Sequence, residues 1–284
     1  MQFKTIIFSL LAASTVAAKR NCGTPSPSGE QTLLAQNLLL DEQAQLQAGN
    51  SSRLASVAAV ESITINVYWH VIASARNVNG GYLAQETLDA QLSVLNDAYA
   101  PHNIQFKQAG ADWTINTQWA NDQGELAMKR QLRKGTYADL NVYFIPGTQY
   151  LGYAYFPENA PQGSQAFTLD GVVILSGSVP GGALPEYNIG HTATHEVGHW
   201  LGLYHTFEGD TCGGNGDFID DTPAEAEAAF GCELERDTCP NDPGKDPVTN
   251  YMDYSDDACF TGFTKGQETR IYNYWDQFRA QFQL

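Results

Sequence analysis

Three histidines and one glutamate between residues 195 and 205 have the spacing of a metal site that performs hydrolysis. His195 and His199 lie four residues apart, so on a helix both imidazoles project from one face and can bind the same ion. Glu196 follows directly, where its carboxylate can take a proton from a metal-bound water. Gly202 can end the helix in a left-handed conformation, which lets the chain turn back and bring His205 to the ion.

This ligand set predicts a catalytic zinc ion rather than a structural one. Three neutral imidazoles leave one position of tetrahedral zinc open, whereas a structural site is closed by a fourth protein ligand. The ion would lower the pKa of its water to about 7, and Glu196 would deprotonate that water and later protonate the leaving amine. His191 also lies four residues before His195, but a helix rises about 12 Å from His191 to His199, so the three cannot share one ion. We interpret His191 as a helix-start residue or one that supports the ligands.

The residues from His195 onward resemble the metzincin clan of zinc peptidases, with Asn250-Tyr-Met-Asp-Tyr254 as a candidate Met-turn. Within that clan, the string from His195 to Phe207 is similar to the pappalysin family of secreted metalloendopeptidases, as is Asp221-Thr-Pro223. The resemblance runs from about residue 63 to residue 263, and it is strongest from His191 onward.

The resemblance implies roles for three further features. Tyr254 is similar to the metzincin tyrosine that hydrogen-bonds at the zinc, and Met252 would form a hydrophobic floor under the imidazoles. Residues 151–157 resemble the antiparallel edge strand on which metzincins bind substrate as an added strand. The alternatives are a packed aromatic residue, an ordinary core methionine and an ordinary edge strand.

Four of the five cysteines follow the histidine motif: Cys212, Cys232, Cys239 and Cys259. Four cysteines allow three pairings, and spacing does not choose among them. The resemblance implies the pairs Cys212–Cys239 and Cys232–Cys259. A second, structural zinc is the alternative, although no Cys-x-x-Cys spacing favours it.

The fifth cysteine, Cys22, lies in Arg20-Asn-Cys-Gly-Thr-Pro25, which resembles the cysteine-switch segments of metzincin proenzymes. Zinc readily binds a thiolate at its fourth position, so Cys22 there would prevent activation of water. Removal of this segment, for example by cleavage near Ser52-Arg53, would open the site. A bridge to another chain and a free thiol are the alternatives.

Residues 1–18 have the features of a secretory signal peptide. Lys4 supplies the positive start, an apolar run covers residues 6–13, and Val16-Ala-Ala18 is a small-residue cleavage site. The run is shorter than the ~20 residues that a membrane span requires. We therefore expect a secreted, extracellular protein without a membrane anchor, whose cysteines meet an oxidising compartment. Asn50-Ser-Ser52 is a candidate glycosylation site.

The rest of the chain divides at about residue 59. We interpret residues 19–59 as a propeptide, because the Gln- and Leu-rich stretch 30–47 predicts a helix with a loose apolar stripe, typical of a segment that lies on a domain. An N-terminal extension of the mature enzyme is the alternative. Residues 60–284 suffice for one metalloprotease catalytic domain.

Hydrophobic periodicity in residues 60–284 predicts an α+β fold. Strands are expected at 63–71, 104–106, 140–145 and 171–175. Helices are expected at 88–99, at 126–132, from about 188, and at 266–282. This order predicts a mixed sheet backed by helices, which matches the upper subdomain of a metzincin. The resemblance thus implies a metzincin-type catalytic domain, a mixed twisted sheet with two long helices above a loop-rich, disulfide-linked lower subdomain.

The net charge of −17 argues against binding to nucleic acid. It also suggests calcium as a second ion, since aspartates crowd the region after the histidine motif: Asp210, Asp217, Asp220, Asp221, Asp253, Asp256 and Asp257. A solvated acidic loop is the alternative. If Asp257 borders the pocket for the residue after the scissile bond, as the resemblance implies, it would favour Arg or Lys there.

These features together predict a secreted zinc-dependent endopeptidase that is made as a zymogen and hydrolyses extracellular proteins or peptides. The alternative is a secreted binding or toxin-like module on an inactive protease scaffold. Such a module would usually have lost Glu196 or a zinc ligand, and this chain retains them all. The physiological substrate and the oligomeric state have no signal in the sequence.

Overall fold

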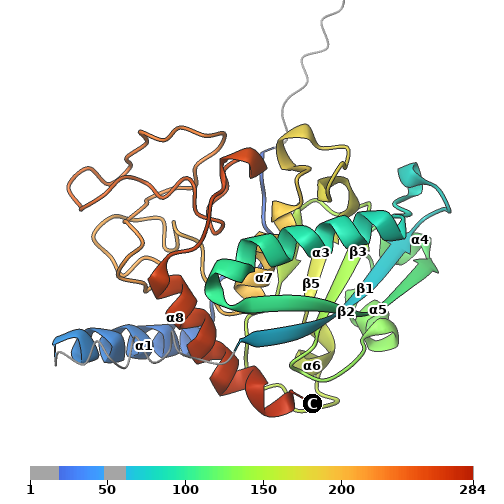
Figure 1. The fold of residues 1–284 in the computed structure, drawn as a ribbon, viewed down its shortest axis with the longest axis horizontal. Helices are drawn as coiled ribbons and strands as arrows, with labels where there is room; N and C mark the ends of the chain where they lie inside the picture. The colour runs from blue at the N-terminus through green and yellow to red at the C-terminus, as the bar shows by residue number, and fades with distance from the viewer. Residues whose placement is uncertain (1–18, 48–61, 284) are drawn as a thin grey trace, which may run out of the picture.

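The computed structural model describes residues 19–47 and 62–283, so the predicted signal peptide, the candidate glycosylation site Asn50 and the predicted cleavage region Ser52-Arg53 lie outside the described residues. Its centre is a five-stranded sheet with strand order β2-β1-β3-β5-β4 (Figure 1). Four strands are parallel: β1 (Ile63–Ala73), β2 (Ile104–Ile115), β3 (Leu140–Ile145) and β5 (Val172–Leu175). The short strand β4 (Gly152–Ala154) runs antiparallel at one edge, within the segment where an edge strand was expected.

Strand β2 is much longer than the predicted residues 104–106. It pairs with β1 from Ile63↔Ile104 to Ala73↔Ile115, across a bulge at Ala109. The prediction was too short because β2 is the other edge of the sheet. An edge strand is held by backbone hydrogen bonds to one neighbour, so its half-buried side chains need no strict apolar pattern.

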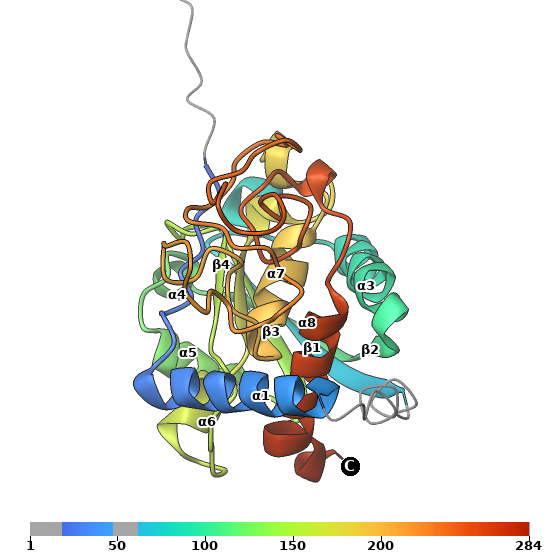
Figure 2. The same cartoon turned by 90° about the vertical axis from the view of Figure 1, so that its left-hand side faces the viewer.

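Two helices cover one face of the sheet, α3 (Gln85–Tyr99) and α7 (His191–Trp200) (Figures 1 and 2). The opposite face packs against α5 (Glu125–Leu132). Two short helices that the sequence did not reveal are α4 (Thr117–Ala120) and α6 (Gln165–Leu169). They are too short for a periodic pattern to be recognised.

Helix α7 begins at His191, three residues later than the predicted start near Asn188. Gly190 adopts φ +100°, in the left-handed region that glycine tolerates, so the preceding residues cannot continue the helix backwards. His191 is therefore the first helical residue, in agreement with one of its two expected roles.

After α7 the chain is irregular and is held together by cross-links. Two disulfides, Cys212–Cys239 and Cys232–Cys259, are the pairs that the family resemblance implied. Near them Arg236 bridges the buried carboxylates of Glu225 and Asp246. These connections substitute for regular secondary structure in the loops at the upper left of Figure 1.

The C-terminal helix changes geometry along its length. Helix α8 (Lys265–Tyr274) begins with a capping box between Thr264 and Gln267. A π-helical turn covers residues 275–279, and a 3-10 turn covers 280–282, so the stretch 266–282 is helical as predicted but not α-helical throughout. Arg279 in the π-helical turn is fully buried and pairs with Asp170 at 2.9 Å, which anchors the end of the chain to the body of the domain.

The N-terminal segment, residues 19–47, lies on the surface of this domain. Its first part is extended beside β4, and helix α1 (Gly29–Gln47) lies across α8 (Figure 2). Ala35 of α1 is buried against Phe156 and Tyr204. The pattern predicted this helix and its position on a domain.

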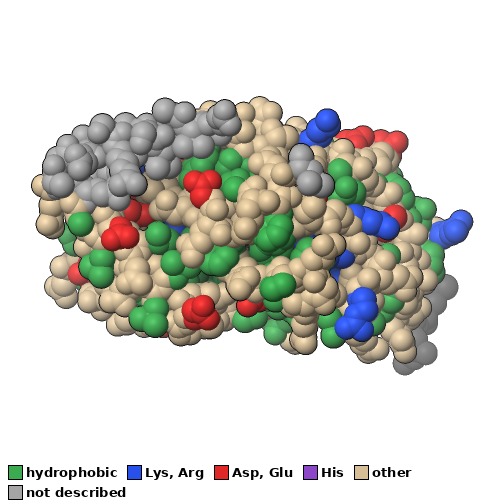
Figure 3. Space-filling model, turned by 90° about the horizontal axis from the view of Figure 1, so that it is seen from below, with side chains coloured by type: hydrophobic (Ala, Val, Ile, Leu, Met, Phe, Trp, Pro, Cys, Tyr) green, Lys and Arg blue, Asp and Glu red, His purple; other side chains and the backbone are tan. Residues whose placement is uncertain are grey.

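Among the described residues, no helix combines the length and apolar character of a membrane span. Figure 3 shows one face of the molecule, on which hydrophobic side chains lie in small groups among polar ones.

Candidate zinc centre and active-site cleft

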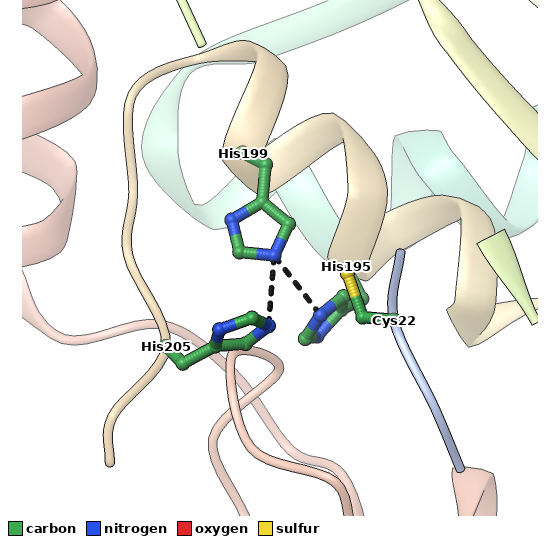
Figure 4. A group of neighbouring side chains, drawn as sticks. All are labelled: Cys22, His195, His199 and His205. Carbon is green, nitrogen blue, oxygen red and sulfur yellow. Dashed lines mark hydrogen bonds between the residues drawn. The ribbon is translucent and has the colours of Figure 1, made fainter. Parts of the chain in front are cut away.

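The three predicted histidine ligands converge. The Nε2 atom of His199 lies 3.2 Å from Nε2 of His195 and 3.1 Å from Nε2 of His205 (Figure 4). Two nitrogens bound to one tetrahedral zinc at about 2.1 Å are about 3.4 Å apart, so this arrangement fits a shared ion. Cys22 Sγ belongs to the same cluster, in which all four atoms lie within 4.8 Å of one another.

Backbone geometry after α7 explains how His205 reaches the cluster. Gly202 adopts φ +100° at the end of the helix. Its N–H bonds to the carbonyl of His199, and the N–H of Leu203 bonds to that of Gly198, which is the Schellman arrangement. A side chain at position 202 would also strike the ring of Tyr274, since a Cβ there would lie 2.5 Å from it. The chain therefore reverses at Gly202, as predicted.

Two ligands are oriented by backbone carbonyls. Nδ1 of His195 lies 2.7 Å from the carbonyl oxygen of Tyr251, and Nδ1 of His199 lies 2.8 Å from that of Leu203. Each carbonyl oxygen accepts a hydrogen bond from Nδ1, so the proton of the neutral ring is on Nδ1. The lone pair on Nε2 is then free to bind a metal. Burial lowers the pKa of His195 and His199 well below the usual value and that of His205 to about 3. All three are thus neutral, the form that binds metal.

Met252 lies directly below this part of the helix. It is fully buried, and its sulfur packs against Gly198, where a Cβ would collide with it. The same turn supplies the Tyr251 carbonyl that orients His195. This position is the one that the resemblance implied for a floor under the imidazoles.

Glu196 is buried beside the cluster, and its carboxylate accepts hydrogen bonds from the N-terminal segment. Its Oε2 accepts a hydrogen bond from Thr24 Oγ1 at 3.0 Å and a weaker one from Cys22 Sγ at 3.4 Å. Burial raises the pKa of Glu196 to about 8. The sequence did not reveal the role of Thr24, because nothing in its surroundings marks it as a partner of a residue so distant in the chain.

The extended part of the N-terminal segment pairs with the edge strand in a parallel sense. Cys22 and Gly152 form a parallel bridge, with hydrogen bonds from Leu151 N to Asn21 O and from Gly23 N to Gly152 O. Tyr254 accepts a hydrogen bond from the Cys22 amide at 3.2 Å. The segment therefore occupies the groove between β4 and the histidine cluster.

Arg20 enters a closed pocket next to the cluster. Its guanidinium lies 2.5 Å from Asp257 Oδ1, and its Nε donates to the carbonyl of Ser255. The rings of Tyr187 and Phe260 face the guanidinium, each at 5.0 Å. The side chains of Arg20 and Asp257 are 1% and 0% exposed, so this is a buried ion pair.

Asp257 is also fixed by the start of α7. Its Oδ2 accepts hydrogen bonds from the amides of Ile189, Gly190 and His191. These bonds stabilise the negative charge of the buried Asp257 carboxylate whether or not a guanidinium is present.

The other aspartates predicted as calcium ligands do not gather into one cluster of side chains. Asp221 caps α8 through Thr264 and Gly266, and Asp253 accepts the amide of Ala229. Among the described residues, the carboxylate, imidazole and thiol groups that converge closely enough for one ion do not include these aspartates. Asp217 differs from them, since its Oδ2 is buried without a hydrogen-bond partner.

Comparison with known proteins identifies the family. Residues 138–276 match the family model described as pregnancy-associated plasma protein-A. An extracellular metalloprotease of Colletotrichum graminicola is 68% identical over the whole of both chains. The chain belongs to the pappalysin family of metzincin peptidases. Another pappalysin relative, an extracellular metalloprotease of Neurospora crassa, is 46% identical over 99% of each chain.

Solved structures agree with this assignment. Mature mirolysin of Tannerella forsythia, in complex with a cleaved peptide, matches 77% of this chain and 93% of its own, at 29% identity and a TM-score of 0.61. A promirolysin mutant matches 91% of this chain and 94% of its own, at 27% identity and a TM-score of 0.64. This pappalysin is therefore a metallopeptidase with the predicted metzincin fold, and peptides are its substrates.

Proposed function

We propose that this pappalysin is a secreted, zinc-dependent endopeptidase that is synthesised as a zymogen. The observation that carries the proposal is the convergence of three imidazole nitrogens beside a buried glutamate and next to the edge strand β4. Its targets would be extracellular proteins and peptides. The alternative, an inactive binding module, has no support in a site that retains every predicted chemical group.

His195, His199 and His205 would hold the zinc ion. When bound, zinc supplies Lewis acidity and lowers the pKa of water to about 7. Glu196 accepts a proton from the attacking water through its Oε2 and transfers it to the leaving amine. Once the N-terminal segment leaves, the Tyr254 hydroxyl loses its bond to Cys22 and becomes a donor for the tetrahedral oxyanion.

Strand β4 would bind the substrate as an additional antiparallel strand. Gly152 supports this role, because a Cβ at that position would lie 2.7 Å from Cγ of Glu196 and would separate the substrate from the catalytic groups. Asp257 would select Arg or Lys immediately after the scissile bond. Its contact with Arg20 supports that preference, since the pocket already accommodates a guanidinium.

Residues 19–59 would act as a propeptide that keeps the enzyme inactive. Cys22 lies where a thiolate can occupy the fourth position of the zinc, and Thr24 engages the catalytic base. The segment runs parallel to β4, opposite to a bound substrate, so its own peptide bonds are presented in the reverse direction. The larger share of this chain matched by promirolysin than by mature mirolysin supports a pro-region.

Activation would follow cleavage between Ser52 and Arg53, where an arginine follows the scissile bond, as the Asp257 pocket would require. A signal peptide at residues 1–18 would direct secretion, and Asn50 would carry a glycan. The relatives named extracellular metalloproteases support this location.

Calcium would bind in the loop around Asp217 and stabilise it. Burial raises the pKa of Asp217 to about 7, and its unpartnered Oδ2 lies in a pocket of about 200 Å³ lined by Asn215, Asp220 and Glu225 among others. Carboxylate and carbonyl oxygens are the ligands that calcium prefers.

The substitution Glu196→Ala tests the proposal. The variant should bind zinc as the wild type does and lose at least about 10²-fold in peptide hydrolysis, because only the proton acceptor is removed. Zinc content is measured by atomic absorption and hydrolysis with a casein or peptide substrate, with and without a chelator. The exposed Glu233→Ala is the matched control. Near-normal hydrolysis by the zinc-loaded Glu196→Ala variant would refute the assignment.

A further inference from the structure

A second pocket lies across β4 from the zinc centre. It has a volume of about 240 Å³ and is bounded on one side by Gly23 and Pro25 of the N-terminal segment. The body of the domain contributes Asp122, Glu125, Tyr150, Tyr153 and Tyr155, and we call the site that these five residues form the tyrosine–carboxylate pocket. These residues come from the turn before α5, from α5 and from the segment around β4. None of them contacts the histidine cluster or takes part in the catalytic scheme above.

The pocket is held open by a network of hydrogen bonds. Tyr153 donates to Asp122 Oδ1 at 2.8 Å, and Tyr155 donates to Glu125 Oε2 at 2.9 Å. The three tyrosine rings meet edge to face, with centroids 6.5 Å apart for the pairs Tyr150–Tyr153 and Tyr153–Tyr155. Fixed rings and fixed carboxylates together form a preorganised surface.

The backbone at Asp122 is held in an unusual conformation. Its φ of +58° lies in the left-handed region, which a non-glycine residue adopts only at a cost. The carboxylate accepts the bond from Tyr153 through Oδ1, and no described residue donates a hydrogen bond to its Oδ2.

Charge in the pocket favours a cation. Lys129 is buried behind Tyr155, where its ammonium lies 2.8 Å from Glu125 Oε1 and 4.7 Å from the ring centroid. Lys129 thus neutralises Glu125, but in the described part of the chain no cationic side chain pairs with Asp122. One uncompensated carboxylate surrounded by aromatic faces is an environment that attracts an ammonium or guanidinium group.

The path of the N-terminal segment shows that this pocket faces the peptide-binding groove. Cys22 and Thr24 point to Glu196, whereas Gly23 and Pro25 line the tyrosine–carboxylate pocket, as expected when side chains alternate along an extended chain. A Cβ at Gly23 would lie 2.5 Å from Cδ2 of Tyr150. Glycine therefore lets the segment pass below the Tyr150 ring without filling the pocket.

The direction of β4 assigns the pocket to one side of the scissile bond. A substrate antiparallel to β4 has its amino-terminal residues near Ala154 and its carboxy-terminal residues near Leu151. Arg20, in the pocket proposed for the residue after the scissile bond, lies beyond the Leu151 end, and Pro25 lies beyond the other. The tyrosine–carboxylate pocket thus serves residues before the scissile bond.

We infer that Asp122, Glu125, Tyr150, Tyr153 and Tyr155 form a specificity subsite that binds a Lys or Arg side chain of the substrate on the amino-terminal side of the scissile bond. This inference rests on the proposed peptidase function and extends it. The enzyme then recognises basic residues on both sides of the scissile bond. Asp257 binds the residue after the bond, and this subsite binds a residue before it.

Peptides that differ at one position test the subsite. All carry Arg after the scissile bond, and each of the first three positions before it is occupied in turn by Lys, norleucine or Glu. The secreted, processed enzyme should hydrolyse the Lys peptide about fivefold faster in kcat/KM than the norleucine peptide at one of these positions, with the Glu peptide slowest.

Asp122→Asn is the matched variant, because asparagine also tolerates positive φ and can accept the Tyr153 hydrogen bond. It should lower the Lys-to-norleucine ratio in kcat/KM by about twofold or more. Tyr150→Leu should reduce the ratio without changing charge. The exposed Asp276→Asn serves as a control for loss of one negative charge and should leave the ratio unchanged.

The outcomes separate this inference from the proposed function. Equal hydrolysis of Lys and norleucine peptides at all three positions would overturn the subsite and leave the peptidase intact. A Lys preference that Asp122→Asn and Tyr150→Leu both retain in full would also overturn it. Failure to cleave any peptide would overturn both proposals.

Discussion

Replacement of Arg20 by alanine should release the precursor from inhibition. Arg20 is the one charged side chain of the extended part that is buried, and it donates both to Asp257 and to the carbonyl of Ser255. Arg20→Ala removes these bonds and the contacts with two aromatic rings. Residues 20–24 would then be held in the groove only by Cys22, Thr24 and backbone hydrogen bonds.

The size of the effect follows from the geometry. Loss of one partner of a buried ion pair costs about 3–5 kcal/mol. The lower end of this range applies to Arg20→Ala, since Asp257 keeps three backbone N–H donors that stabilise its charge. About 3 kcal/mol corresponds to a rise of about 150-fold in the fraction of precursor whose groove is open.

The assay is hydrolysis of a short peptide by the uncleaved precursor, in which Arg53→Ala blocks the proposed cleavage. Lys19→Ala is the matched control, because Lys19 is the neighbouring cation but is exposed, with its ammonium over the ring of Phe230. Arg20→Ala should gain activity and Lys19→Ala should not. If the Arg20→Ala precursor is as inactive as the wild type while a Cys22→Ser precursor is active, the buried ion pair does not anchor the segment.

Three further predictions concern the site and its supports. Cys22→Ser should make the uncleaved precursor active, since a hydroxyl is a poorer zinc ligand than a thiolate. If the Cys22→Ser precursor is as inactive as the wild type, the N-terminal segment inhibits by covering the site and not through its thiol. Gly202→Ala should lower the free energy of unfolding by about 1–2 kcal/mol for the left-handed backbone alone. It should also reduce zinc content by displacing His205, and an unchanged melting curve and metal content would contradict this. Millimolar calcium should raise the melting temperature at pH 8 and have little effect at pH 5, because the folded-state pKa of Asp217 is raised to about 7. Asp217 stabilises the calcium-free fold only at low pH, where it is protonated, and this contribution is lost as the pH rises through 7. Calcium then compensates the negative charge that forms on Asp217. Asp217→Asn should abolish the calcium effect, and a response retained in that variant would place the ion elsewhere.

Periodicity predicted most of the scaffold that carries the site. Strand β3, which spans Leu140–Ile145, has the predicted bounds because it is a mainly apolar run that is buried along its whole length. Helix α5 begins one residue before its predicted start and ends where predicted. The edge strand β2 was underestimated for the opposite reason, since half-buried residues impose no strict pattern. The start of α7 depended on the φ value of Gly190, which periodicity does not report.

The convergence of the three histidines proposed as zinc ligands, with Glu196 beside them, could be predicted because these residues lie close together in the sequence. Helical geometry brings His195 and His199 to one face, and a left-handed glycine returns His205, so local rules are sufficient. The Cys22 prediction came from a short motif, and the structure brings that cysteine to the cluster from a distant part of the chain.

Other features were decided only by the tertiary structure, because they join segments whose separation in sequence carries no signal. The pairing of Arg20 with Asp257 spans 237 positions, and the bond of Thr24 to Glu196 spans 172. The dispersal of the aspartates has the same origin, since packing placed Asp221 at the start of α8 and Asp253 against the amide of Ala229. Sequence by itself determined the chemistry that local backbone geometry assembles, whereas the contacts that block and shape the groove depend on how the whole chain folds.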